Sequence, residues 1–203
     1  MARKLTSQKR ADLLNASIKI FKAKGFRDAT VKDIVTEAGA STATFYRYFK
    51  TKDDVYSQIF TAFLVGYGEI WSSLYTSMSG PVKSKEEVLQ VAAESFRAVL
   101  AYYRDNRDLA KIVFRHIVPV DERFVDQTEA LVETTFAQLE EAIEEMRRSG
   151  LGRRIEPRVG SALIVGAVYG VSMLCIVDDR RDDVDSIVDQ LMEIVENGLT
   201  HSH

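Results

Sequence analysis

Cysteine, proline and histidine are scarce in this chain of 203 residues, which has one, three and three of them respectively. The single cysteine, Cys175, excludes an internal disulfide framework and fits a reducing compartment. So few prolines disfavour a loop-rich β-sandwich. Residues 1–20 contain no apolar run of signal-peptide length, so we expect no secretory signal and a cytoplasmic protein.

Residue patterns typical of catalytic and metal sites are also lacking. Two histidines, His201 and His203, lie at the end of the chain, which leaves His116 as the only other one. No P-loop, no metal-ligand spacing and no nucleophile paired with a base occurs in a supporting context. The sequence therefore predicts no catalytic residue, no metal and no cofactor, and we do not expect an enzyme.

Charge is divided unevenly along the chain. Residues 1–55 carry 12 Lys and Arg against 6 Asp and Glu, a net charge of +6, whereas residues 56–203 carry 15 against 24, a net charge of −9. Lys and Arg bind a polyanion by releasing its condensed counterions. The basic part is therefore either a nucleic-acid-binding region or an ordinary solvated surface.

Apolar residues recur with helical period in nearly every segment, and no useful stretch alternates as a strand. The sequence predicts an all-α fold, with a small domain over residues 1–52 and a larger one over residues 53–203. Breaks are expected at Gly25, at Gly80-Pro81 and at Pro119. The nine expected helices span about 7–24, 31–38, 41–48, 52–78, 84–104, 106–116, 122–148, 157–177 and 183–198.

The third expected helix lies in the stretch GASTATFYRYFK, residues 39–50. At about 100° per residue, Phe45 and Phe49 point to one side and predict its buried face. The opposite side holds Arg47, flanked by Ala43 and Thr44. Arg pairs with guanine, Thr bonds a base or packs on thymine, and Ala permits close approach. The alternative is a helical hairpin with tyrosines on its surface.

Two hydroxyl residues flank this ridge. Tyr46 and Thr42 carry donors that reach phosphates, which position a protein on DNA without specifying sequence. Two helices joined by a short turn containing Gly39 form a helix-turn-helix arrangement. The geometry thus favours a DNA-binding helix and a helical hairpin with tyrosines on its surface about equally.

A longer pattern surrounds this stretch. It combines Phe21, Gly25 and Phe26 with Thr-Val-x-x-Ile-x-x-x-Ala-Gly over residues 30–39, and continues through Ser41, Phe45-Tyr46-x-Tyr48-Phe49 and Lys52. From about Ser7 to Tyr56 the chain resembles the DNA-binding domain of the tetracycline-repressor (TetR) family of bacterial transcription regulators. The resemblance covers about a quarter of the chain. One departure is Ala40, where the family commonly has a larger apolar residue.

The resemblance implies a nine-helix TetR-like fold, with a three-helix DNA-binding domain before a ligand-binding and dimerisation domain. It implies phosphate contacts from Thr30, Ser41 or Thr42, Tyr46 and Lys52, base contacts from Ala43, Thr44 and Arg47, and a mixed role for Tyr48. The implied protein is a homodimeric repressor, cytoplasmic and nucleoid-associated when bound to a palindromic DNA operator, and released by a small-molecule inducer. An activator, or an architectural or partner-docking protein without an inducer, remains an alternative.

The eighth expected helix contains 19 uncharged residues, from Val159 to Val177, which raises a transmembrane alternative. Its glycines and serines, and the lack of a second such segment, favour a helix buried inside the protein and against a twin, with no membrane partner. Gly166 and Gly170 form a smooth patch on it, and an apolar stripe follows on the ninth helix. The candidate dimer residues are Gly166, Gly170, Ile187, Leu191 and Val195.

Large rings on the fourth to eighth helices are candidates for an apolar or amphipathic ligand site, with core packing as the alternative reading of each. Arg115 is the added polar candidate, because it can hold an anionic group. The candidate ligand residues are Tyr67, Trp71, Phe96, Tyr103, Phe114, Arg115, Phe136 and Tyr169.

Overall fold

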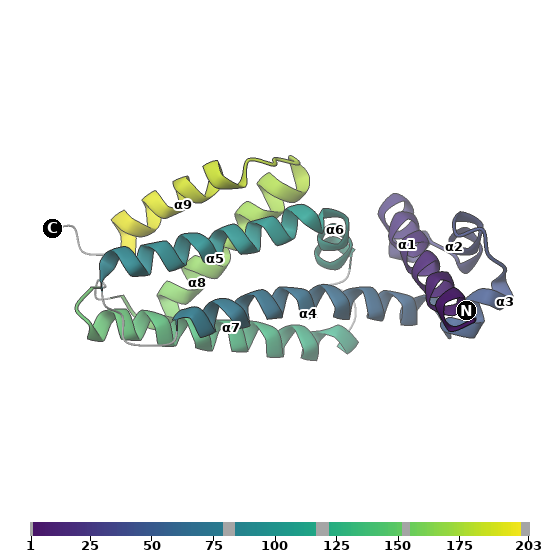
Figure 1. Cartoon of the computed structure of the whole chain (residues 1–203), viewed down its shortest axis with the longest axis horizontal. Helices are drawn as coiled ribbons and strands as arrows, with labels where there is room; N and C mark the ends of the chain where they lie inside the picture. The colour runs from purple at the N-terminus through teal and green to yellow at the C-terminus, as the bar shows by residue number, and fades with distance from the viewer. Residues whose placement is uncertain (1, 79–83, 117–121, 152–154, 200–203) are drawn as a thin grey trace. The chain divides into compact units, whose positions relative to one another are not determined.

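The structure, a computed structural model, describes residues 2–78, 84–116, 122–151 and 155–199. These residues form nine α-helices and one π-helical segment, with no strand among them (Figure 1). The predicted all-α fold is confirmed. The expected breaks at Gly80-Pro81 and Pro119, and the terminal His201 and His203, lie outside the described residues. The elements are α1 (Ala2–Asp28), α2 (Val31–Glu37), α3 (Thr42–Tyr48), α4 (Lys52–Met78), α5 (Lys85–Asp105), α6 (Arg107–His116), α7 (Glu122–Arg148), α8 (Pro157–Val171), η1 (Ser172–Asp178) and α9 (Val184–Leu199).

The chain divides into two compact units. Unit 1 comprises residues 1–64 and 108–125, and unit 2 comprises residues 65–107 and 126–203. Unit 1 extends beyond the expected boundary at residue 52 because the first part of α4 and most of α6 pack into it. The Tyr56 hydroxyl donates to the carbonyl of Ile112 at 3.3 Å, and both residues are buried.

Unit 1 is built around α1, α2 and α3. Helix α1 is interrupted at Gly25, which has φ 78°, as the sequence predicted. Thr30 begins α2 with a reciprocal capping box. Its hydroxyl oxygen accepts from the Asp33 backbone N–H at 3.1 Å, and the Asp33 carboxylate accepts from the Thr30 backbone N–H at 3.0 Å. These bonds satisfy N–H groups that a helix start otherwise leaves without partners.

The Asp33 carboxylate gives unit 1 an acid-sensitive contact. A hydrogen bond from Lys24 (2.7 Å), and then the hydrogen bonds from Thr30, lower the pKa of Asp33 from 3.8 to about 2. Because the folded pKa is depressed, this stabilisation is complete above pH 3.8 and is lost as the pH falls through about 2.

We therefore expect Asp33→Asn to lower the free energy of unfolding most above about pH 4, and progressively less toward about pH 2. Urea titrations of the wild type and the variant at about pH 6 and about pH 2.5 measure this difference. The same loss of stability at both pH values would contradict the role of the Asp33 charge.

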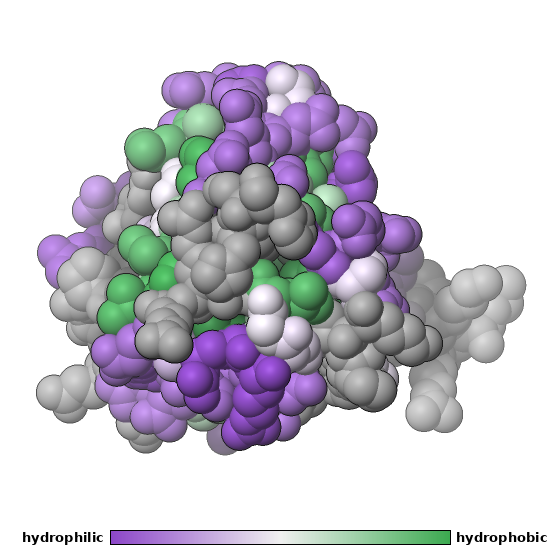
Figure 2. Space-filling model, turned by 90° about the vertical axis from the view of Figure 1, so that its left-hand side faces the viewer, coloured by the Kyte–Doolittle hydropathy of each residue, from purple (hydrophilic) through white to green (hydrophobic). Residues whose placement is uncertain are grey.

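Helix α5 is the centre of unit 2, where it packs against α9 and η1 (Figure 1). The apolar stripe of α9 faces this contact, and its residues Val184, Ile187, Val188 and Leu191 are buried. Among the coloured residues in Figure 2, hydrophilic side chains surround hydrophobic ones that are visible between them. The amphipathic pattern of α9 is therefore used inside the chain.

The eighth expected helix is not uniform. It is α-helical to Val171 and continues as the π-helical segment η1. Arg107 stabilises the end of η1, because its guanidinium donates to the carbonyl of Ile176 at 2.8 Å and to that of Arg181 at 2.6 Å. The same guanidinium pairs with Asp182 at 2.6 Å. Arg107 thus fixes the turn that leads into α9.

Candidate nucleic-acid interface

Helix α3 is held in unit 1 by two buried phenylalanines. Phe45 and Phe49 are 0% and 1% exposed, and their ring centroids lie 5.5 Å apart. The inward face predicted from helical phase is confirmed. Before α3, the turn after α2 places Gly39 at φ 59°, a left-handed conformation that side chains other than glycine adopt at a cost.

The outward face of α3 carries the chemistry expected of a DNA reader. Ala43 and Arg47 are exposed, and no described acidic side chain pairs with Arg47. Tyr46 is 56% exposed and packs its ring edge against Phe45 at 5.4 Å. Tyr48 is half-buried beside Phe49. The structure therefore presents an arginine, a small residue and a tyrosine hydroxyl on one short helix.

Hydroxyl groups at the start of α3 are engaged with each other. The Ser41 hydroxyl oxygen accepts from the Thr44 backbone N–H at 3.1 Å, and the two hydroxyls lie 2.8 Å apart. Thr44 is half-buried, whereas Thr42 is exposed. Of the two residues that the resemblance offered for one phosphate contact, Ser41 is the helix cap and Thr42 has the more open hydroxyl.

Positive charge around this helix is only partly neutralised. Some lysines of α1 are paired with carboxylates, as Lys19 is with Glu37 at 2.9 Å. No described acidic side chain pairs with the exposed Arg27, Lys32 or Lys50. These free cations, together with Arg47, are the groups of unit 1 that can attract a polyanion.

Lys52 occupies a different position from the one that the resemblance implies. Its ammonium donates to three carbonyls, those of Phe26 at 2.6 Å, Arg27 at 2.9 Å and Ala29 at 2.8 Å. It also lies 4.7 Å from the centroid of the Phe26 ring. An ammonium has three N–H donors, so all of them are used within the chain. Lys52 thus holds the end of α1 against the start of α4, instead of standing free for a phosphate.

We expect Lys52→Ala to lower the free energy of unfolding by about 2 kcal/mol, because three carbonyls lose a charged donor. Lys50→Ala is the control, since Lys50 is exposed and its backbone N–H, not its side chain, bonds to Asp54. Urea unfolding measures both variants. Weaker DNA binding with unchanged stability would instead support the phosphate contact.

The candidate ligand residues divide into separate groups. Tyr67, Trp71 and Tyr103 come together in unit 2, with Tyr67 at 6.2 Å from Trp71 and 5.9 Å from Tyr103 between ring centroids. Tyr102, which the sequence reading did not single out, joins them at 6.4 Å from Tyr67. Phe96 is buried on α5. Burial raises the pKa of Tyr103 well above its ordinary value, so its hydroxyl stays neutral.

The other candidates lie elsewhere. Phe114 packs on Phe63 in unit 1 at 5.7 Å, and Phe136 lies under the Arg158 guanidinium at 4.7 Å. Tyr169 is 43% exposed. The side chain of Arg115 is outside the described residues. The type of ring and the helix on which it lies were not enough to predict which candidate residues come together.

The candidate dimer residues also divide. Gly166 and Gly170 face open space, with no atom within 4 Å of where a Cβ would stand. Ile187 and Leu191 are instead buried within the chain, because α9 packs its stripe on α5, and this corrects their expected place at a dimer surface. Val195 is half-buried. The exposed aliphatic residues of α8, η1 and α9 include Leu163 at 60% and Leu174 at 64%, together with Val159 and Ile194.

Residues Pro157–Asp178 are long and apolar enough to span a membrane by length and composition, with a mean hydropathy of 2.1. One helix of this kind is weak evidence for a membrane protein, because the core helix of a soluble protein passes the same test. A third of this window is buried inside the chain. Leu163, Tyr169 and Leu174 are among the exposed residues of this segment.

Comparison with known proteins connects unit 1 to a family. Residues 13–59 match the family described as bacterial regulatory proteins, tetR family. An HTH-type transcriptional regulator of Bacillus subtilis, YdgC, is 29% identical over 107 residues, which are 53% of each chain. The chain therefore spans about half the length of the relatives that it matches in this way.

Solved structures extend the similarity in fold over nearly the whole chain. PfmR from Thermus thermophilus, a TetR family transcriptional regulator, has a TM-score of 0.76 at 16% identity, covering 93% of this chain and 99% of its own. FadR from Bacillus subtilis, solved in complex with stearoyl-CoA, has a TM-score of 0.66 at 17% identity, covering 93% and 98%. At such identities the likeness establishes the fold alone.

Proposed function

We propose that this chain, which belongs to the tetR family of bacterial regulatory proteins, is a repressor that binds a palindromic operator as a homodimer and leaves it when a small molecule binds unit 2. It is a DNA-binding transcriptional regulator acting in the bacterial cytoplasm. The observation that carries the proposal is the outward face of α3, where Arg47, Ala43 and Tyr46 stand exposed.

Base reading is assigned to the exposed ridge of α3. Arg47 donates two hydrogen bonds to guanine, Ala43 lets the helix approach the base edges, and Thr44 contacts a base through its methyl group. Tyr46 and Thr42 bond phosphates and fix the register of the helix in the groove. A helix held by Phe45 and Phe49 presents these groups rigidly, which favours selective binding.

The homodimer is proposed from the apolar surface of α8 and η1. Leu163 and Leu174 are largely exposed, and Gly166 and Gly170 leave room for a second helix to approach closely. A second copy of the same surface covers this face across a two-fold axis. Because two-fold symmetry relates the two α3 helices, the operator is a palindrome.

The inducer is proposed to bind near the aromatic cluster of unit 2. The indole N–H of Trp71 is buried and has no hydrogen-bond partner among the described residues, so an acceptor on a ligand would stabilise it. Tyr67 and Tyr103 supply ring surface beside it. An apolar or amphipathic molecule fits these walls. It acts by binding more tightly to the conformation that does not fit the operator.

DNA selection followed by fluorescence anisotropy tests this function. The purified dimer is expected to select a palindrome from random-sequence DNA and to retain it against random competitor. The outcome that overturns the proposal is equal binding to all sequences. A complex with one protomer per selected site would overturn the dimer.

The close packing of the cluster favours one alternative. Trp71 and Tyr103 are only 6% and 1% exposed, as in a filled core. A DNA-bound architectural or partner-docking protein without an inducer would have such an interior. Selective DNA binding that no small molecule relieves would support it.

A further inference from the structure

A groove of about 440 Å³ lies on unit 2 between α4 and α5. This volume falls within the range of small-molecule sites. Tyr67, Trp71 and Tyr103 are not among its described lining residues, but the groove adjoins their cluster through Tyr102, whose ring lies 6.4 Å from that of Tyr67. Its described lining residues are Gly66, Glu69, Ile70, Ser73, Ala98 and Tyr102.

The wall of the groove depends on a glycine. A Cβ built on Gly66 would stand 2.6 Å from the Tyr102 hydroxyl oxygen and 3.1 Å from two carbons of its ring. Only a residue without a side chain therefore lets the Tyr102 ring lie across α4. The half-buried ring presents an aromatic surface beside the apolar Ile70 and Ala98.

The described lining of the groove carries one negative charge, that of Glu69. Among the described residues that line the groove, Glu69 is the only charged one, it is exposed, and no described cation pairs with it. Burial, and then the charge of Glu69, raise the pKa of Tyr102, so the phenol stays neutral beside the carboxylate. An aromatic face next to an unpaired carboxylate attracts a cation, through the ring quadrupole and through the charge.

We propose that this groove binds a small amphipathic cation, an ammonium with an aromatic or aliphatic body. The ammonium lies at Glu69 and the Tyr102 ring, and the apolar body lies on Ile70 and Ala98. A fatty-acyl anion is disfavoured because Glu69 repels it. The inference names a ligand class for the regulation proposed above and rests on that function only for the effect of the ligand on DNA.

Binding is measured on the full chain, without DNA, by calorimetry and by the fluorescence of Trp71, the only tryptophan. Trp71 follows Ile70 of the groove directly in α4, so it reports changes there. The probes are benzyltrimethylammonium, its neutral isostere neopentylbenzene and the anion phenylacetate. The ammonium is expected to bind more tightly than both others. Equal or weaker binding of the ammonium would overturn the proposal.

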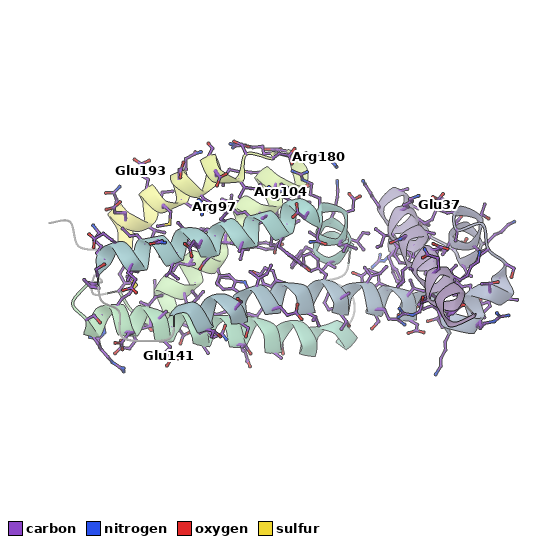
Figure 3. All side chains as sticks on the ribbon, viewed as in Figure 1. Glu37, Arg97, Arg104, Glu141, Arg180 and Glu193 are labelled. Carbon is purple, nitrogen blue, oxygen red and sulfur yellow. The ribbon has the colours of Figure 1, made fainter. Side chains whose placement is uncertain are left out.

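Two variants test the groove itself. Glu69→Gln keeps the shape and is expected to weaken ammonium binding about fivefold, the effect of one exposed charge pair. The matched control is Glu193→Gln, because Glu193 projects outward from α9 and does not line the groove (Figure 3). The same loss in both variants, or none in Glu69→Gln, would contradict a specific pairing.

Gly66→Ala tests the wall while leaving Glu69 in place. The added methyl displaces the end of the Tyr102 side chain, so ammonium binding is expected to fall, although alanine favours the helix. Thermal unfolding monitors the fold, and unchanged affinity in the folded variant would overturn the role of the Tyr102 ring.

Raising the salt concentration is expected to weaken ammonium binding in the wild type.

The inference and the proposed function fail separately. If the ammonium binds through Glu69 but does not release the protein from its operator, the groove is a binding site and its proposed regulatory role is wrong. If the ammonium does not bind while another molecule releases the operator, the inducible repressor stands and the groove proposal is wrong.

Discussion

Replacing Leu163 with arginine is expected to turn the proposed dimer into a monomer. Leu163 is 60% exposed in one chain and stands on α8 three residues before Gly166, which faces open space. If a second α8 covers this face, the two-fold axis brings both introduced guanidiniums into an apolar interface. Burying unpaired charges costs several kcal/mol, so we expect the dissociation constant of the dimer to rise by about 100-fold or more.

Sedimentation equilibrium over a range of protein concentrations measures this change. Val132→Arg is the control, because Val132 is also an exposed apolar residue but lies on α7. It is expected to leave the dimer intact, and circular dichroism confirms that both variants remain helical. If Leu163→Arg remains a dimer, α8 is not the interface. Dissociation by both variants would point to a broader surface.

We expect loss of the proposed dimer to bring loss of operator binding. A monomer engages one half-site, so it forgoes the effective concentration that links the second α3 helix to its half-site. We expect Leu163→Arg to bind the palindrome no better than an isolated half-site. Stable membrane association of the wild type would show that lipid, instead of a second copy, covers the face.

Arg47→Ala is expected to relax sequence preference at one position in each half-site. Arg47 is exposed, and α3 is held by buried Phe45 and Phe49, so the variant keeps its fold. Losing a bidentate contact to guanine weakens binding by about 1–3 kcal/mol on operators that carry the preferred base at that position. Binding to operators with another base there changes little. The largest loss is thus confined to one base pair and its symmetry mate.

Anisotropy titrations on the selected operator and on its single-base variants measure this pattern. Tyr46→Phe is the comparison, since it removes a hydroxyl assigned to phosphate and is expected to weaken every sequence alike. The fall in affinity with salt should be shallower for Arg47→Ala if Arg47 neutralises a phosphate. A uniform loss over all operators would therefore reassign Arg47 from base to backbone.

Local sequence predicted the helices and their ends well. The break at Gly25 and the start of α4 at Lys52 lie where the sequence placed them. These features depend on a few neighbouring residues and on helical period, which a sequence records directly. The burial of Phe45 and Phe49 followed from helical phase for the same reason.

Contacts between distant segments were not predicted. The sequence assigned Lys52 to phosphate, but the carbonyls of Phe26, Arg27 and Ala29, more than 20 residues away, take its three donors. The sequence correctly predicted that Ile187 and Leu191 lie on an apolar stripe. The stripe alone does not show whether α5 or a second chain covers it. The pairing of Gly66 with Tyr102 carries no local pattern at all.

The sequence by itself determined that the protein is all-helical and roughly where most of its helices lie. It also determined that one short helix turns Ala43, Tyr46 and Arg47 outward. Only the tertiary structure decided which apolar faces are buried in one chain, which stay exposed on α8, and where the groove of Glu69 lies. The physical reason is that helix formation depends on bonds between residues three or four apart. Burial and charge pairing, in contrast, depend on which distant side chains the fold brings together.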